Sequence, residues 1–482
     1  MLRRTKIVAT LGPATDDPKV LDEMIQAGID VVRVNFSHGS PEDHIRRAET
    51  VRNRARAHGR HVGVLADLQG PKIRIERFRD GKVFLEEGAT FTLDANWPAD
   101  QGNDERVGVT YKGLPADVTR GDTLLLDDGC IVLWVDRVEG AEIVCRVVNG
   151  GVLSNNKGIN RQGGGLSAKA LTDKDRADIK VAAAMEADYV AVSFPRNAAD
   201  IHEARELLRA AGGHGGIVAK IERAEAVAAL DEIIAAADAV MIARGDLGVE
   251  IGDAELPAVQ KRIIHQARSM DRVVITATQM MQSMVDSPIP TRAEVFDVAN
   301  AVLDGTDAVM LSAETATGKN PAKAVAAMDR ICRGAEKERV AKVSSHRINT
   351  QFRRIDEAIA MAAMYTANHL GVRAIAALTE SGATPLWMSR ISSGIPIYAL
   401  TRHVATRRKV TLYRGVYPVS FDVTTTDHAQ VNKEAIDELV RRGAVRDGDL
   451  VIITKGDLMG VHGGTNAMKI VRVGDMVVPK TE

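Results

Sequence analysis

Short apolar runs recur along the chain, and most of them end in polar or charged residues. The segments between them, such as Lys19–Ala27, space their apolar residues as on one face of a helix. This alternation predicts βα units and a parallel sheet. The predicted strands are Lys6–Leu11, Asp30–Val34, His61–Ala66, Asp188–Val192, Ile217–Ala219, Ala239–Ala243, Val273–Ile275 and Ala308–Leu311.

Eight such runs, separated by about 25–35 residues outside one insertion, predict an α/β fold of the (β/α)8 TIM-barrel class. Binding and catalytic residues of such a barrel lie at the carboxyl ends of the strands. Residues 1–71 and 167–345 would form this barrel, which we expect to be the catalytic domain.

The pattern changes over residues 72–166, where short runs alternate with turns such as Asp127-Asp128-Gly129. No segment there has helical spacing, so we expect an inserted all-β domain, and its Gly- and Asn-rich return path, Gly150–Gly165, should flex. The expected strands are Lys82–Leu85, Thr90–Leu93, Thr123–Leu126, Cys130–Val135 and Ile143–Val148.

Residues 346–482 predict a separate, open α/β sheet domain. A helix is expected over Asp356–Leu370, and strands over Ala374–Leu378, Ile397–Leu400, Val416–Phe421 and Leu450–Thr454. One loop follows a strand and opens a helix, where hydroxyls and backbone N–H groups form an anion site. Its residues are Thr379, Glu380, Ser381, Gly382, Ala383 and Thr384.

The bulk composition excludes several classes of protein. A net charge of −1 gives no electrostatic footprint for nucleic acid or an anionic membrane, and no apolar run is long enough to span a bilayer. The cysteines Cys130, Cys145 and Cys332 lie far apart, without metal-ligand spacing or a disulfide framework. Their usage fits a reducing, cytoplasmic compartment. The basic N-terminus is followed by an apolar run that Gly12-Pro13 interrupts, which favours a strand over a signal peptide.

The strongest chemical signal is the pair Lys220 and Glu222. Two residues apart at a strand's end, they would project to the same side. Asp246 follows in the next strand-like stretch, Val240–Glu250, and two carboxylates can hold Mg²⁺ while leaving positions for substrate oxygens. Arg33 and Arg74 add positive charge suited to a phosphorylated anion.

Plainer interpretations stay open for each of these residues. Lys220 and Glu222 could form an internal salt bridge, and Asp246 could be a turn or helix cap. The hydroxyls of Thr278 and Ser312 suit proton relay but are more often structural hydrogen bonders. For His38, a structural or nucleotide-contact role is as plausible as catalysis.

Motifs throughout the barrel resemble those of the pyruvate kinase family. They are T-K-I-V-A-T-L-G-P-A-T at the start, V-R-V-N-F-S-H-G around Arg33, D-L-Q-G-P-K-I-R around Asp67, N-K-G-I-N around Lys157, A-K-I-E-R at Lys220, A-R-G-D-L-G-V-E at Asp246, A-T-Q-M-M-Q-S-M at Thr278, P-T-R-A-E-V-F-D-V-A-N-A-V-L-D-G-T-D at Pro290–Asp307 and M-L-S-A-E-T at Ser312. The insertion resembles the family's β-barrel lid, and the C-terminal sheet its regulatory domain.

The resemblance implies transfer of the phosphoryl group of phosphoenolpyruvate to ADP in glycolysis, giving pyruvate and ATP. It implies Mg²⁺ or Mn²⁺ held by Glu222 and Asp246, with Lys220, Thr278 and Ser312 as catalytic residues. Phosphoenolpyruvate would be bound by Arg33, Lys220, Gly245, Asp246 and Thr278. The nucleotide would be bound by Asn35, Phe36, Ser37, His38, Arg74 and Lys157. A homotetramer and allosteric control through the C-terminal domain are also implied.

Two departures from the family pattern change these expectations. Many members need K⁺ and carry Glu at the position of Lys72 and Thr-Lys at Leu68-Gln69. The Lys72 ammonium could replace that cation, so K⁺ should not be required. The other residues of the monovalent-cation site, Asn35, Ser37 and Asp67, remain. Glu380 lies where fructose-1,6-bisphosphate-responsive members can carry Lys, which favours a sugar monophosphate or AMP as activator over a bisphosphate.

Two rival functions remain at this point. A metal-dependent lyase or aldolase on a pyruvate-like substrate would explain Lys220, Glu222 and Asp246 but not Arg74 and Lys157 in the insertion. A non-enzymatic metabolite sensor would not explain a complete set of site residues. ADP-dependent turnover separates the three.

Overall fold

The computed structural model describes residues 2–338, 351–423, 427–457 and 463–475. They fall into two compact units. The first comprises Met1–Ala66, Ala184–Tyr189 and Ile264–Glu482, and the second comprises Asp67–Ala183 and Val190–Ile263. The domain boundary expected near residue 345 lies outside the described residues.

Eight parallel strands form a closed barrel in the order β1-β16-β15-β14-β13-β12-β3-β2, which confirms the predicted (β/α)8 class. Almost every residue of these strands is buried, as expected for a sheet closed on itself and covered by helices. The strands are β1 Lys6–Thr10, β2 Val31–Asn35, β3 Gly63–Asp67, β12 Tyr189–Val192, β13 Gly216–Ile221, β14 Ala239–Ala243, β15 Val273–Ala277 and β16 Ala308–Leu311.

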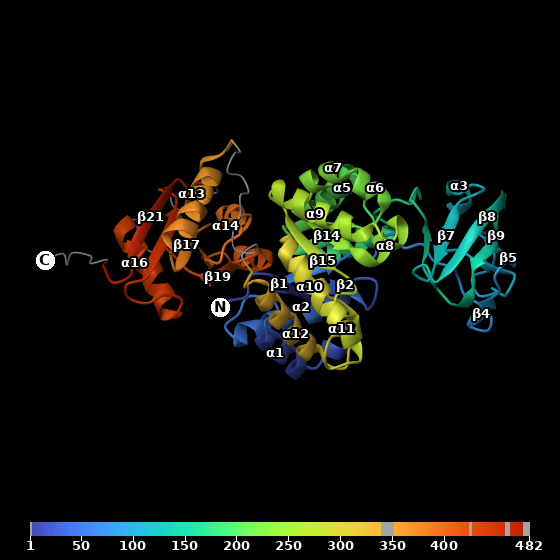
Figure 1. The fold of residues 1–482 in the computed structure, drawn as a ribbon, viewed down its shortest axis with the longest axis horizontal. Coiled ribbons are helices and arrows are strands. Elements are labelled where there is room, and N and C mark those ends of the chain that lie inside the picture. The colour runs from blue at the N-terminus through green and yellow to red at the C-terminus, as the bar shows by residue number, and fades with distance from the viewer. Residues whose placement is uncertain (1, 339–350, 424–426, 458–462, 476–482) are drawn as a thin grey trace. The chain divides into compact units, whose positions relative to one another are not determined.

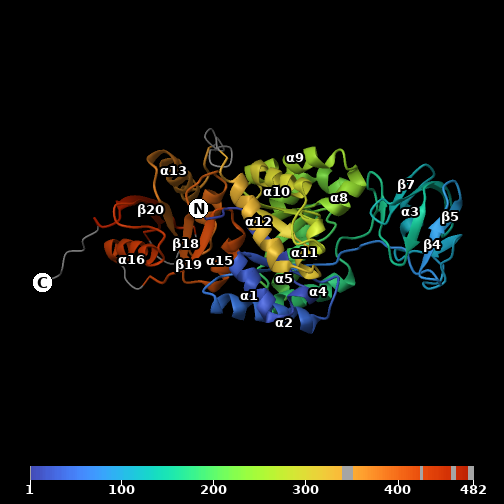
Figure 2. The same ribbon diagram turned by 60° about the horizontal axis from the view of Figure 1, so that its bottom comes forward.

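Local sequence sets the ends of the barrel helices. Helix α2 begins with a capping box in which the side chains of Ser40 and Asp43 bond each other's backbone N–H, and Pro41 occupies its first turn. Helices α1 and α2 lie side by side (Figure 2). The helices are α1 Pro18–Ala27, α2 Pro41–Ala57, α4 Asp173–Ala184, α5 Ala198–Ala210, α6 Ala224–Ala228, α7 Leu230–Ala236, α8 Arg244–Ile251, α9 Leu256–Ser269, α10 Arg292–Asp304, α11 Ala313–Ala316 and α12 Pro321–Ala335.

The insertion is a β-structure with its own apolar core, which includes Phe91, Leu133 and Val147. It has a six-stranded sheet, β11-β7-β8-β9-β5-β6, and a two-stranded sheet, β10-β4. Asp127 and Asp128 have positive φ between β7 and β8, as the turn prediction requires. The strands are β4 Lys82–Leu85, β5 Thr90–Asp94, β6 Arg106–Gly108, β7 Thr123–Leu126, β8 Ile131–Glu139, β9 Glu142–Asn149, β10 Gly151–Ser154 and β11 Ile159–Arg161.

Two details of the insertion differ from the sequence prediction. One helical turn, α3 Leu114–Asp117, interrupts the β-structure, where no helix was expected. The Gly- and Asn-rich return path contains β10 and β11, so it is hydrogen-bonded to β4 and β7 over much of its length.

The C-terminal segment, orange to red in Figure 1, is an open sheet in the order β19-β18-β17-β20-β21. Four strands match the predicted runs, and the antiparallel edge strand β21 was not predicted. A core that includes Ala376, Leu400, Val431 and Ile453 packs against one face. The elements are α13 Ile355–Leu370, β17 Ala374–Leu378, α14 Ala383–Ser389, β18 Ile397–Thr401, α15 Val404–Lys409, β19 Val416–Ser420, α16 His428–Arg441, β20 Leu450–Lys455 and β21 Ala467–Arg472.

Candidate active site

Lys220 and Glu222 meet at the carboxyl end of β13, as predicted. The Lys220 Nζ lies 2.9 Å from Glu222 Oε1 and 3.3 Å from Asp67 Oδ1, at the end of β3. It also donates a 2.7 Å hydrogen bond to the Ser193 hydroxyl, and the other Glu222 oxygen accepts from the Phe194 N–H at 2.8 Å. All five residues are buried.

The electrostatics of Glu222 suit a metal ligand. Burial raises the pKa of its carboxyl group, Lys220 opposes that rise, and the neighbouring carboxylate of Asp246 reinforces it. Two carboxylates that destabilise each other's charge can bind a divalent cation. Across the described residues no group of three His, Cys, Asp or Glu could hold a metal. A pair fits Mg²⁺ or Mn²⁺, which take one or two carboxylates and fill other positions with water or substrate oxygens.

Asp246 lies in a helix, not in a strand. Strand β14 ends at Ala243, α8 begins at Arg244, and Gly245 and Asp246 occupy the first helical turn. Asp246 Oδ1 lies 3.2 Å from the Nζ of Lys72. The N-cap residue of α8 is Ala243 and no side chain caps this helix, so Asp246 is not a helix cap, although the positive end of the helix dipole stabilises its charge.

The insertion carries the two cations expected on the nucleotide side. A guanidinium N–H of Arg74 donates to the Asn156 carbonyl at 2.8 Å, and Lys157 Nζ lies 2.7 Å from Asp127 Oδ1. Both side chains come from loops next to β11 and the β7–β8 turn.

Strand β2 holds Arg33, expected to bind phosphoenolpyruvate, and β2 with the turn after it holds Asn35–His38, expected to bind the nucleotide. Arg33 donates to the Thr10 hydroxyl at 3.2 Å, and the Ser37 N–H donates to Asn35 Oδ1 at 3.1 Å. His38 is exposed. The Phe36 ring is buried and lies 4.3 Å from the His44 ring, so its side chain belongs to the core.

The loops after β15 and β16 hold Thr278 and Ser312. Thr278 and Gln279 have φ of 67° and 51°, values that cost a β-branched residue energy and that concentrate at functional sites. Glu314 joins the two loops: it accepts from the Met281 N–H at 3.1 Å and from the Ser312 N–H at 2.6 Å. The Ser312 hydroxyl itself is buried without a hydrogen-bond partner among the described residues.

The C-terminal loop of Thr379–Thr384 borders a cavity of about 150 Å³ at the carboxyl ends of β17 and β18. Thr379 Oγ1 accepts from the Gly382 N–H at 2.9 Å. The Glu380 carboxylate contacts the ring of His403 and lies 3.9 Å from the Arg402 guanidinium. The Glu380 carboxylate, from which we predicted a monophosphate or AMP as activator, therefore has cationic and polar neighbours.

Comparison with known proteins identifies the family. A family model described as the pyruvate kinase barrel domain matches residues 2–325, and one described as the pyruvate kinase alpha/beta domain matches residues 357–471. The chain belongs to the pyruvate kinase family. It is 59% identical over 476 residues to "Pyruvate kinase II" of Salmonella typhimurium, a match that covers 98% of this chain and 99% of the relative.

Other members of the pyruvate kinase family agree. A pyruvate kinase of Haemophilus influenzae is 56% identical over 459 residues, covering 94% of this chain and 96% of the relative. One of Geobacillus stearothermophilus is 44% identical over 482 residues, covering 99% and 81%. The chain is thus a phosphotransferase with pyruvate kinase function, which removes the lyase and sensor alternatives. The family implies phosphoenolpyruvate and ADP as substrates and a divalent metal. Among the described residues, no helix is long and apolar enough to cross a membrane.

Proposed function

We propose that Glu222 and Asp246 hold the divalent metal and that Lys220 neutralises the phosphoryl group during its transfer. This proposal rests on the buried cluster in which Lys220 contacts Glu222 and Asp67, and in which burial, together with Asp246, raises the pKa of Glu222. A bound Mg²⁺ or Mn²⁺ would compensate these carboxylates and the phosphoryl oxygens. Phosphoryl transfer needs mainly positioning and charge compensation, which a fixed, desolvated lysine provides.

Phosphoenolpyruvate would bind to Arg33, Gly245, Asp246 and Thr278. The Thr278 hydroxyl donates to the Ala277 carbonyl at 2.7 Å, and this bond together with the positive φ of Thr278 supports a positioning role. Thr278 and Ser312 would belong to the network that protonates the enolate left after phosphoryl transfer. The Ser312 hydroxyl, which has no hydrogen-bond partner among the described residues, supports this role, because a buried hydroxyl is normally hydrogen-bonded.

The nucleotide phosphates would bind to Asn35, Ser37 and His38, with the backbone of Phe36, and to Arg74 and Lys157. The proposed domains are a barrel of residues 1–71 and 167–345, a lid of residues 72–166 and a regulatory domain of residues 346–482. Because Arg74 and Lys157 belong to the lid, closure of the lid would bring charge to the nucleotide and exclude water as a competing acceptor.

We propose that K⁺ is not required because Lys72 supplies the positive charge. Its Nζ lies 3.2 Å from Asp246, a proposed metal ligand, which supports a fixed cation beside the reacting groups. Asn35, Ser37, Asp67 and the carbonyl of Leu68 are the residues that would otherwise complete a monovalent-cation site.

The cavity at Thr379–Thr384 would bind a phosphorylated activator, either a sugar monophosphate or AMP. Its volume and the hydroxyls of Thr379, Ser381 and Thr384 suit one phosphate. Glu380 would then face the rest of the ligand, where a carboxylate accepts hydrogen bonds from hydroxyl groups.

A homotetramer in the cytoplasm completes the proposal. Phe296 and Ile289 near α10 are 71% and 68% exposed, and Ile355 on α13 is 69% exposed. Exposed apolar side chains on the barrel and on the C-terminal domain support interfaces on both.

The test measures pyruvate formed from phosphoenolpyruvate and ADP with Mg²⁺, in K⁺-free buffer and after K⁺ is added. We expect equal rates in both buffers. We expect Lys72→Glu to need K⁺, whereas the same charge change at Lys82, exposed on β4, should leave the rate independent of K⁺. Activity of the wild type only with K⁺ would keep the enzyme and refute the role of Lys72.

A further inference from the structure

A second cavity, of about 500 Å³, lies at the amino ends of β17 and β18. Among the described residues, its lining includes four arginines and two tyrosines but no aspartate or glutamate. They are Arg4, Arg333, Arg373, Arg442, Tyr398 and Tyr417. The size is that of a small-molecule site.

Two of the arginines lack full compensation for their charge. Within the described parts of the chain, the Arg373 guanidinium makes no hydrogen bond or ion pair. Arg442 Nε donates to the Glu438 carboxylate at 2.7 Å, but the Arg441 guanidinium donates to the same carboxylate at 2.6 Å. One carboxylate is thus shared by two guanidinium groups, which leaves positive charge at the cavity.

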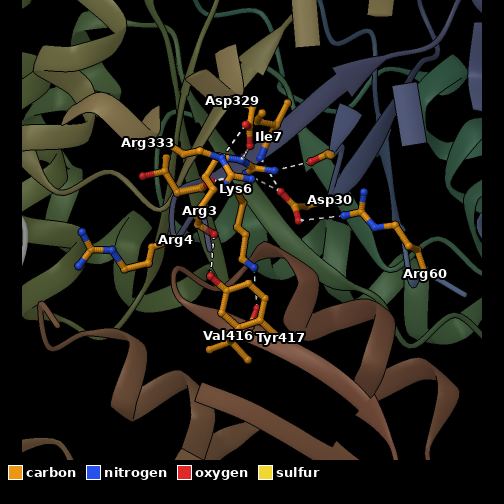
Figure 3. Close-up of polar contacts among 12 residues, drawn as sticks. Arg3, Arg4, Lys6, Ile7, Asp30, Arg60, Asp329, Arg333, Val416 and Tyr417 are labelled. Carbon is orange, nitrogen blue, oxygen red and sulfur yellow. Dashed lines mark hydrogen bonds and ion pairs between the residues drawn. The ribbon is translucent and has the colours of Figure 1, made fainter. Parts of the chain in front are cut away.

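The third arginine repeats this arrangement. Arg333 Nε donates to Asp329 at 2.7 Å, and Arg3 Nε donates to the other oxygen of that carboxylate at 2.8 Å. Figure 3 shows Arg333, Arg3 and Asp329 together, with Tyr417 at the foot of the same network. Because Arg3 also pairs with Asp30 at 2.8 Å, the α12 side of the cavity is balanced, and the uncompensated positive charge is that of Arg373 and Arg442.

The aromatic wall is held in place before any ligand binds. The Tyr417 hydroxyl donates to the Arg3 carbonyl at 2.7 Å, and Lys6 Nζ lies 4.5 Å from the Tyr417 ring centroid (Figure 3). The rings of Tyr398 and Tyr417 lie 5.7 Å apart. A preformed wall reduces the entropy lost on binding.

This cavity is separate from the activator loop. The loop cavity is lined by Leu378 and Leu400 with the residues after them, at the carboxyl ends of β17 and β18. The second cavity is lined by Arg373 and Pro396, which precede the same strands. The length of a five-residue strand, about 16 Å, separates the two.

We propose that this cavity binds a small polyanion, either a phosphate ester or a polycarboxylate, whose charges pair with Arg373 and Arg442. Guanidinium groups bind phosphate and carboxylate oxygens in bidentate pairs. The apolar wall of Tyr398 would cover the uncharged part of the ligand.

The test uses the full chain and modification of arginine by phenylglyoxal, read residue by residue by mass spectrometry. Pyrophosphate and citrate are the two probes, one for each source of charge. A probe that binds in the cavity should, at saturation, slow the modification of Arg373 and Arg442 several-fold. The rate of modification of Arg441 should not change. Arg402 reports separately on occupancy of the activator loop.

Variants then assign the effect to the cavity. Removing one charge-assisted pair in Arg373→Ala should weaken protection of Arg442 about tenfold. Because Arg373 is exposed and has no ion-pair partner among the described residues, this variant should fold normally, which its melting temperature checks. Arg441 shares Glu438 with Arg442 but does not line the cavity. In Arg441→Ala, the probes should therefore still protect Arg373 and Arg442 from modification. Failure of both probes to protect Arg373 at millimolar concentration, or equal protection in Arg373→Ala, would overturn the proposal.

Discussion

The Ser312 hydroxyl is a buried polar group without a hydrogen-bond partner among the described residues, so the folded chain gains little from it. Replacing it in Ser312→Ala removes no hydrogen bond, and we expect an unchanged or slightly raised melting temperature. If the hydroxyl carries a proton to the enolate, kcat for pyruvate formation should fall by about 10-fold or more. Thermal unfolding and steady-state kinetics measure the two effects separately.

Thr315, three residues further on, is the matched control. Its hydroxyl donates to the Thr10 carbonyl at 2.8 Å, so Thr315→Val should lower stability by about 1 kcal/mol. A loss of stability in Ser312→Ala equal to that of Thr315→Val, without a loss of kcat, would show a structural role for Ser312.

At the scale of elements, buried strands were the most predictable part of the chain. β14, β16 and β17 coincide with their predicted runs, because a strand buried on both faces is a continuous apolar sequence. Strands β6 and β11 have three residues each, too few to show an alternation. The edge strand β21 has a single buried residue, Val471, so it forms no apolar run, and it pairs with β20.

Residues of the candidate site were likewise predictable where they lie at the end of a buried, apolar strand. Lys220 and Glu222 were predictable because they end an apolar run. The Phe194–Glu222 and Met281–Glu314 bonds were not, because they join residues 28 and 33 positions apart in neighbouring βα units. No periodicity within one segment reports such contacts.

Helix α8 meets strand β11 of the insertion at Glu250. The Gly163 N–H donates to the Glu250 carbonyl at 2.9 Å, and the Glu250 carboxylate accepts from the Ala224 N–H at 3.0 Å. Burial raises the pKa of this carboxyl group to about 7, and Glu225 adds to the rise. The folded state therefore holds a proton that the unfolded chain releases near pH 4.5, and stability falls as the pH rises from about 4.5 to 7.

We expect Glu250→Gln, which keeps the acceptor but removes the charge, to melt about 2–5 °C above the wild type at pH 8. The difference should shrink as the pH is lowered to 5, where the wild-type carboxyl group is protonated. Glu206→Gln, on the exposed face of α5, should shift the melting temperature little at either pH. A difference that is the same at pH 5 and pH 8 would contradict the raised pKa.

At the scale of the whole molecule, a buried ion pair within the first compact unit links the barrel to the C-terminal segment. The Arg390 guanidinium, fully buried, contacts both oxygens of Asp307 and donates to the Arg272 carbonyl at 2.7 Å. Asp307 in turn accepts from the Val274 N–H at 2.9 Å, beside β15. Residues far apart in sequence are thus joined by one charge pair, which no pattern along the chain could predict.

Removing one partner of this buried pair should destabilise the protein more than removing one partner of an exposed pair. Arg390→Ala leaves the Asp307 carboxylate buried without its cation, and we expect a loss of about 3–5 kcal/mol of unfolding free energy, with faster proteolysis of the C-terminal segment. Arg472→Ala removes a pair whose side chains are 53% and 71% exposed, so its melting temperature should hardly change.

If the two variants unfold alike in thermal and protease assays, the Arg390–Asp307 pair does not hold the two segments together. If only Arg390→Ala is weakened, the C-terminal sheet is anchored beside β15 and β16, the strands that carry Thr278 and Ser312 at their ends.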